Sequence, residues 1–142
     1  MRKYLILLLF PLALGLAQAR ECPSDTQAQA QPQVQEASSL VRSGQFRGAS
    51  GHATGGTVSL YNEGSKFFLQ LESNFNFDGA PDPKLGFSRD GRLVKSSVFA
   101  PLRRDQGRQV YELPAGFNPD NFDAVTLYCE QFDVNLGQAV WS

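Results

Sequence analysis

Two cysteines and one histidine are the residues of this sequence suited to redox or metal chemistry: Cys22, Cys129 and His52. Cys129 alternates with Val125 and Leu127 in the strongest strand pattern of the chain, which predicts that its side chain is buried. A redox-active cysteine requires instead thiolate character and some exposure. Three roles therefore stay open for Cys129: a core thiol, a disulfide or other redox group, or a metal ligand.

The second cysteine, Cys22, precedes the region that we expect to be ordered. Two cysteines in an exported chain favour a disulfide between Cys22 and Cys129. The intervening segment is long enough to reach back, but the sequence does not define the geometry that a disulfide needs. An unpaired Cys22 would be exposed and could join two chains.

Two polar residues lie in expected loops. His52 sits in the glycine-rich segment 51–56, where a lone histidine is most often a surface or hydrogen-bonded residue. Asp82 belongs to the loop 73–83, which contains two prolines, and its carboxylate is expected to accept nearby backbone N–H groups. The other acidic loop residues lack the spacing of an EF-hand calcium loop: Asp78, Asp120 and Asp123.

The N-terminus has the three parts of a secretory signal peptide. Arg2 and Lys3 precede an apolar run over residues 4–16, and Ala17-Gln18-Ala19 forms a small-x-small cleavage pattern. We expect cleavage after Ala19, which defines residues 1–19 as the signal peptide and predicts a periplasmic or secreted protein. The run is short for a bilayer span, so an uncleaved anchor is the lesser alternative, and no transmembrane segment is expected after cleavage.

The residues around the cleavage site also bear on lipidation and charge. Arg20 and Glu21 directly before Cys22 argue against a lipoprotein signal. Removing Arg2 and Lys3 from the 13 basic residues leaves 11 against 14 acidic ones, a net charge of −3. With no long basic run, a nucleic-acid partner is not expected.

Several kinds of centre are excluded by residues that the chain lacks. There is no Cys-x-x-Cys-His motif for covalent c-type haem. The only methionine is Met1, which leaves with the signal peptide, so the mature chain cannot bind haem through a His/Met ligand pair. One histidine is too few for a blue-copper site, and no Gly-x-Ser-x-Gly supports a hydrolase. No catalytic motif is recognised, and the identity of any metal or cofactor stays unknown.

The distribution of turns and alternation predicts the organisation of the mature chain. Residues 20–43 are rich in Gln and Ala and read as a flexible tether, whereas residues 44–142 form one domain. Short strands separated by Gly and Pro turns predict an all-β fold, an antiparallel β-sandwich or partly open barrel. The expected strands cover 57–61, 66–72, 85–88, 110–113, 124–130 and 137–141. The residues expected to face one core are Val58, Leu60, Phe67, Leu69, Leu71, Val125 and Leu127.

Four motifs in order resemble a known family, the electron-transfer DM-thirteen domain, which is often found beside DOMON domains. The motifs are Gly44-x-Phe46 with Gly51-His52-x-x-Gly55-Gly56-x-Val58; Leu69-x-Leu71-x-x-x-Phe75 with Gly79-x-Pro81-Asp82; Gln109-x-Tyr111-Glu112-Leu113-Pro114; and Val125-x-Leu127-x-Cys129-x-x-Phe132-x-Val134-x-x-Gly137-x-Ala139. The resemblance implies a β-sandwich module with a redox role for Cys129. It also places a histidine at position 52, which makes His52 and Asp82 candidate supporting residues.

Two hypotheses follow. The first is an exported module, redox-linked through Cys129, with an unknown redox or protein partner in the cell envelope. The alternative is a non-catalytic binding module that uses loops at one end of the fold. A strand that continues to Phe132 and Val134 would have to shift its facing after Cys129, which predicts a bulge at Glu130-Gln131 and a Cys129 sulfur near the His52 loop.

Overall fold

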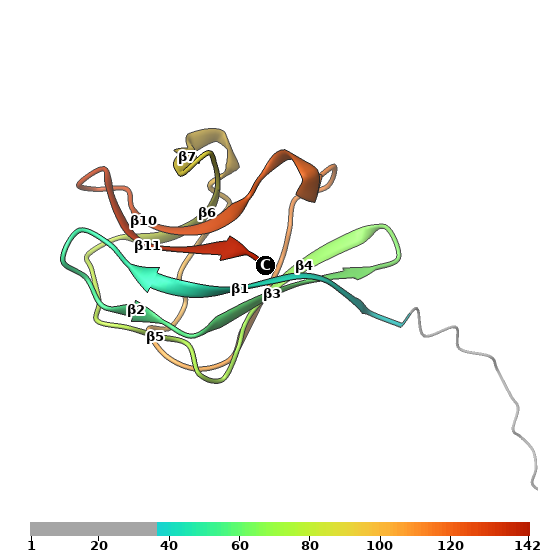
Figure 1. Ribbon diagram of the computed structural model, residues 1–142, viewed down its shortest axis with the longest axis horizontal. Coiled ribbons are helices and arrows are strands. Elements are labelled where there is room, and N and C mark those ends of the chain that lie inside the picture. Colours follow the sequence, from blue (N-terminus) through green and yellow to red (C-terminus); the bar gives the residue numbers. More distant parts are fainter. Residues whose placement is uncertain (1–36) are drawn as a thin grey trace, which may run out of the picture. The chain divides into compact units, whose positions relative to one another are not determined.

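The computed structural model describes residues 37–142, and this part of the chain is all-β (Figure 1). Two short 3₁₀ helices, η2 (Lys95–Ser97) and η3 (Pro119–Asn121), lie in its loops. No helix within this range has the length and apolar character needed to cross a membrane. The strands are β1 (Ser39–Gly48), β2 (Thr54–Gly55), β3 (Thr57–Glu63), β4 (Lys66–Leu71), β5 (Asn76–Phe77), β6 (Pro83–Arg89), β7 (Arg92–Val94), β8 (Ala100–Pro101), β9 (Gln109–Glu112), β10 (Ala124–Cys129) and β11 (Val134–Trp141).

One curled antiparallel sheet dominates the fold. Its strands follow the order β7-β6-β10-β11-β1-β3-β4-β9, with β8 added beside β6, and β2 pairs separately with β5. The sheet bends round so that the β6-β10-β11 part and the β1-β3-β4 part enclose a common interior (Figure 1). The expected antiparallel all-β fold is confirmed, in the form of a half-barrel.

The side chains that alternation predicted to face the core lie in the interior of the sheet. Six of the seven residues expected in the core have no exposed surface, and the seventh, Phe67, is partly buried and packs against them. The register explains the agreement, because Val58 lies opposite Leu71 and Leu60 opposite Leu69 across the β3–β4 hairpin. Period-two alternation therefore identified the inner face of this hairpin correctly.

The ordered region begins earlier than expected. β1 starts at Ser39, so residues 39–43, which the sequence analysis assigned to the tether, pair with β3. The register shifts between Leu40 and Arg42, and this bulge interrupts the alternation that would have indicated a strand. The expected signal peptide, Cys22 and the part of the expected tether before residue 37 lie outside the described residues.

β10 is buried on both faces. All six of its residues are buried, and β7 with the following η2 segment covers the outer face. On β6, an added Cβ at Gly86 would lie 3.0 Å from Val98 and 3.1 Å from Leu93, which shows how closely this segment packs. The Ser88 and Thr126 hydroxyl groups hydrogen-bond to each other beneath it, so buried polar groups here are paired.

The β6–β7 hairpin has the turn that its sequence indicates. Arg89 pairs with Arg92, and Asp90 and Gly91 between them both have positive φ, 53° and 75°. This is the type I′ geometry that Asp-Gly favours, because it matches the twist of the flanking strands. The tight turn returns the chain over β6 and so positions the η2 segment.

Candidate functional site

Cys129 lies at the end of β10 and inside the core. Its exposed fraction is 2%, and it belongs to the same buried cluster as Val125 and Leu127. It pairs with Pro83 of β6 on one side and Val134 of β11 on the other. The predicted burial is confirmed, and within residues 37–142 Cys129 forms no disulfide.

The predicted bulge at Glu130-Gln131 is wrong. β10 ends at Cys129, and residues 130–133 form a turn that leads directly into β11. Phe132 sits in this turn with 61% of its surface exposed, so it does not face the core. The irregularity lies earlier, between Leu127 and Tyr128, where the β10–β11 register shifts. The sequence argument failed because it extended the strand through what is a hairpin turn.

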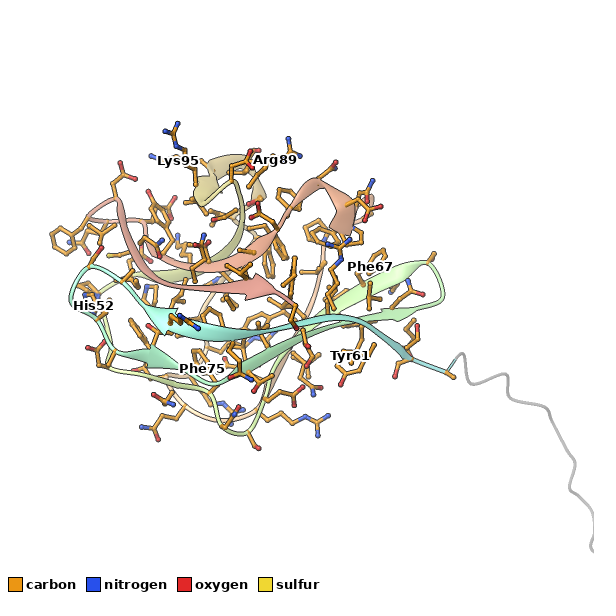
Figure 2. All side chains as sticks on the ribbon, in the orientation of Figure 1. His52, Tyr61, Phe67, Phe75, Arg89 and Lys95 are labelled. Atoms are coloured by element: carbon orange, nitrogen blue, oxygen red, sulfur yellow. The ribbon has the colours of Figure 1, made fainter. Side chains whose placement is uncertain are left out.

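His52 pairs with a carboxylate that the sequence analysis had not assigned to it. Figure 2 shows the ring in the loop between β1 and β2, and Nδ1 lies 2.9 Å from Oδ1 of Asp78. The other carboxylate oxygen of Asp78 accepts the Ala53 N–H at 3.0 Å, and the Asp78 N–H binds the Ala53 carbonyl. These two donors, the Ala53 N–H first and the His52 ring second, hold the pKa of Asp78 below its ordinary value of 3.8.

The contact with Asp78 engages one of the two ring nitrogens of His52, Nδ1. A carboxylate only accepts hydrogen bonds, so Nδ1 of His52 carries the proton and is engaged with Asp78. The His52 ring rests on Phe77, with ring centroids 5.9 Å apart, and Phe77 belongs to the core cluster that also contains Cys129. His52 thus fastens the β1–β2 loop to the β5 region.

Asp82 lies close to Cys129 in the fold but has a different role from the one expected. Its carbonyl oxygen, not its carboxylate, accepts a backbone N–H, from Glu130 at 3.2 Å. The carboxylate lies 3.8 Å from Nζ of Lys84, which also hydrogen-bonds to Glu130. These acids, Glu130 before Asp82, raise the pKa of Lys84. In this loop it is the carboxylate of Asp78, rather than that of Asp82, that accepts a backbone N–H.

A second ion pair holds the β10–β11 turn. The Asp133 carboxylate accepts the Tyr128 hydroxyl and lies 2.9 Å from Nζ of Lys95. The Tyr128 hydroxyl and then Lys95 lower the pKa of Asp133, and Asp133 raises the pKa of Lys95. Lys95 also stands 6.0 Å from the Tyr128 ring centroid, so the η2 segment is anchored to β10. Sequence spacing offered no signal for this network, because Lys95 comes from a separate loop.

The remaining acidic loop residues are engaged in structural contacts. Asp120 pairs with Arg42 at 2.6 Å, and Asp123 accepts the Asp90 N–H at 2.7 Å. Within residues 37–142, no group of three His, Cys, Asp or Glu side chains is placed to hold a metal ion.

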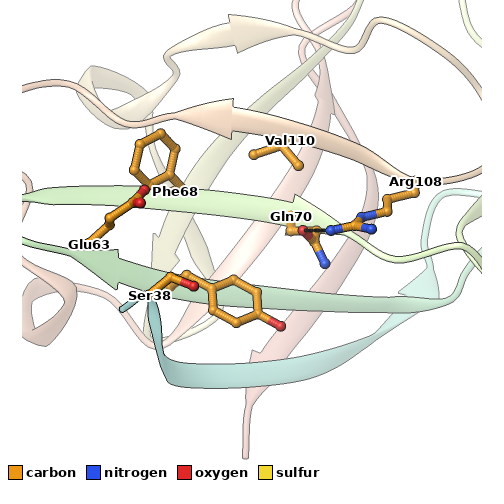
Figure 3. Close-up of a pocket in the computed structure, with 7 residues that line it drawn as sticks. Ser38, Glu63, Phe68, Gln70, Arg108 and Val110 are labelled. Atoms are coloured by element: carbon orange, nitrogen blue, oxygen red, sulfur yellow. Dashed lines mark hydrogen bonds between the residues drawn. The ribbon is translucent and has the colours of Figure 1, made fainter. Parts of the chain in front are cut away.

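Two of the hollows on the surface of the described region combine aromatic side chains with polar groups. The first, shown in Figure 3, has a volume of about 380 Å³ and lies over β3, β4 and β9. It combines opposite charges, Glu63 and Arg108, with two aromatic rings, Tyr61 and Phe68. Arg108 donates a hydrogen bond of 3.0 Å to Oε1 of Gln70.

The second hollow, of about 460 Å³, lies between the η2 segment and the loop that joins β9 to β10. We call it the aromatic hollow because four phenylalanines line it: Phe87, Phe99, Phe117 and Phe122. Phe117 and Phe122 are on the loop after β9, Phe87 is on β6, and Phe99 follows η2. The sequence analysis did not single out these residues, since no local pattern indicates that three separate segments converge.

Comparisons with known proteins give one match. Residues 45–141 match the family described as Electron transfer DM13. Searches of curated proteins and of solved structures each found no match. The matched span runs from β1 through β11 and includes His52, Asp82 and Cys129. This match covers more than half of the chain and contains the motifs that carried the resemblance, apart from Gly44. The chain is therefore a member of the electron transfer DM-thirteen family.

Proposed function

We propose that this protein is an exported, electron-transfer-related module that acts by binding, and that the Cys129 thiol contributes to packing rather than to redox chemistry. The family description supports the link to electron transfer. The basic, apolar and small-residue pattern of residues 1–19 supports export to the periplasm or the exterior.

The enclosure of Cys129 carries the proposal. Reactive cysteines are partly exposed and lie near positive charge, whereas Cys129 is 2% exposed among aliphatic and aromatic side chains. Lys84 is the nearest cation along the paired strand, but it pairs with Tyr128, the residue before Cys129. Successive strand residues point to opposite faces, so Lys84 and the Cys129 sulfur lie on different sides of the sheet.

Redox chemistry at Cys129 is the second candidate function, and one observation favours it. Cys129 is the last residue of β10, next to the exposed turn 130–133. Local opening of this turn would uncover the thiol. Its thiolate could then attack a disulfide of a partner protein, forming a mixed disulfide while the partner's other sulfur leaves as a thiol, and attack by Cys22 on that mixed disulfide would leave a Cys22–Cys129 disulfide and a fully reduced partner. The family description is compatible with either candidate.

Thiol labelling separates the two candidates. We expect Cys129 in the folded Cys22→Ser protein to resist a maleimide label that reacts fully in denaturant, with intact mass as the readout. The wild-type mass should show a labelled Cys22 and an unlabelled Cys129. Rapid labelling of folded Cys22→Ser protein, or a wild-type disulfide that reductant opens, would instead establish Cys129 as an accessible redox group.

Export is tested on the N-terminus itself. Protein recovered from the periplasm or the medium should begin at Arg20, Glu21 and Cys22. An acylated Cys22 as the first residue would make the protein a lipoprotein. Retention of residues 1–19 on exported protein would contradict the cleavage site.

A further inference from the structure

The aromatic hollow has the size and composition of a small-molecule site. Its volume of about 460 Å³ falls within the usual range for ligand pockets, about 300–1,000 Å³. Phe87, at its base, is 1% exposed, while Phe99, Phe117 and Phe122 are only partly buried. The walls therefore offer apolar surface that a ligand would remove from water.

The rings of the hollow pack on one another. Phe117 and Phe122 are inclined by 12° with centroids 5.7 Å apart, and Phe87 and Phe99 by 19° at 5.6 Å. Phe87 joins the two pairs at 5.2 Å from Phe122, inclined by 30°, and at 4.7 Å from Phe117, inclined by 40°. Rings this close admit no ligand between them, so a ligand ring would stack, in an offset arrangement, on the surface that the partly buried Phe99, Phe117 and Phe122 leave uncovered.

The lining excludes a charged ligand. None of the residues that form the hollow is acidic or basic: Phe87, Ser96, Ser97, Val98, Phe99, Pro114, Ala115, Gly116, Phe117, Asn118, Asn121 and Phe122. An ion entering it would lose hydration without gaining a counter-charge. The hollow of Figure 3 differs in this respect, since Glu63 and Arg108 both line it.

The rim supplies amide groups in a fixed loop. Oδ1 of Asn118 accepts the Asp120 N–H at 2.9 Å, which orients the amide and makes its Nδ2 group the donor end. The Asn121 carbonyl accepts Nε of Arg89 at 2.7 Å, and the Asp123 N–H binds the Ser88 carbonyl. These bonds tie the loop to β6, so the site is formed before any ligand arrives.

We propose that the aromatic hollow binds a neutral, planar ring system that carries a carbonyl oxygen at its edge, the chemical class to which quinones belong. The rings stack on the ligand face, and the Asn118 amide donates to the carbonyl. The proposed site goes beyond the proposed function, because the argument for it uses only the residues of the hollow. Choosing a redox-active ligand such as a quinone, rather than another neutral planar carbonyl compound, rests on the proposed link to electron transfer.

An isosteric pair of probes tests the site without involving redox chemistry. We expect 2-acetylnaphthalene, which is neutral and planar, to shift the amide NMR signals of Phe87, Ser97, Phe99, Asn118 and Phe122 in the full mature protein. The anionic 2-naphthoate, of nearly the same shape, should bind at least tenfold more weakly. Equal binding of the two probes would overturn the neutral-ligand assignment, and shifts centred elsewhere would overturn the site.

Three variants sharpen the result. Ala115→Trp places an indole at the mouth of the hollow and should reduce probe binding at least tenfold. Asn118→Asp keeps an oxygen to cap the Asp120 N–H but replaces the amide donor with a negative charge, so binding should weaken severalfold. Phe132→Ala, which removes an exposed ring that does not line the hollow, should bind as the wild type does.

The outcomes are distinguishable from those of the thiol experiment. Each variant is first checked for a wild-type amide spectrum, so lost binding is not confused with unfolding. Unchanged binding in both Ala115→Trp and Asn118→Asp overturns the site, whatever the labelling of Cys129 shows. Binding that requires a Phe132 ring would likewise overturn it.

Discussion

The interior around Cys129 and the aromatic hollow are both apolar, yet one is filled and the other is open. Val125, Leu127 and Cys129 leave at most 2% of their surface exposed, whereas Phe117 and Phe122 border a space of about 460 Å³. The first region is built from strands that pair residue by residue. The second is built where loops meet, and loop backbones do not interdigitate as strand faces do. Burial therefore supports the packing role proposed for Cys129, and the open space supports the binding site proposed at the aromatic hollow.

The largest expected effect comes from emptying the filled region. Leu127→Ala removes a side chain with no exposed surface and should lower the free energy of unfolding by about 2–5 kcal/mol. Urea unfolding measures this loss. Phe132→Ala, at 61% exposure, serves as the control and should change stability by less than about 0.5 kcal/mol. Similar losses in the two variants would mean that β10 is not the packed centre of the fold.

A smaller effect is expected at Cys129 itself. Cys129→Ser puts a hydroxyl among apolar side chains and should cost about 1–3 kcal/mol if that group finds no partner. Cys129→Ala, which introduces no polar atom, should cost less, and comparing the two variants isolates the polar penalty. A serine variant as stable as the alanine variant would show that the site is wetter than its 2% exposure implies.

At the wall of the open region the cost of a substitution should be smaller still. Phe122→Leu exchanges a partly buried ring for an aliphatic side chain beside existing space, so we expect a loss of about 1 kcal/mol or less. Urea unfolding again gives the number. A loss as large as that of Leu127→Ala would show that the Phe122 side chain belongs to the tightly packed core.

The smallest effect is a pH dependence at the His52–Asp78 pair. The pKa of Asp78 is lowered in the folded protein, so the ionised carboxylate favours folding above its ordinary, unfolded pKa of 3.8. This contribution disappears as the pH falls through the lower folded pKa. Asp78→Asn should therefore flatten the acid side of the thermal stability profile. Gln131→Asn exchanges one exposed, uncharged amide for another and provides a comparison that should leave that side unchanged.

The strands were predictable where alternation and turns agreed. The β3–β4 hairpin combines alternation on both strands with a Gly64-Ser65 turn, and its inner face followed directly. The start of β1 was not predictable, because the Leu40–Arg42 bulge breaks the period and pairing with β3 supplies the order. The burial of the outward face of β10 was not predictable for a related reason, because the η2 segment that covers it comes from elsewhere in the chain.

The candidate site was predictable only in part. Alternation indicated the burial of Cys129, but residue spacing could not show which carboxylate His52 meets. Asp78 and Asp82 occupy the same loop, and its backbone path decides that Asp78 faces Ala53. The aromatic hollow depends on three segments converging, and such convergence leaves no trace in local periodicity.

The pairing of β1 with β11 has a consequence for how the chain folds. These strands come from opposite ends of the described region and are neighbours in the middle of the sheet, with Gly44 opposite Trp141. The sheet therefore cannot close until nearly the whole domain has been synthesised, and contacts this distant in sequence form slowly. A chain delayed in this way stays unfolded longer after leaving the ribosome. If it is exported as proposed, that delay keeps it in a state that can be threaded through a membrane channel, and the sheet assembles on the far side.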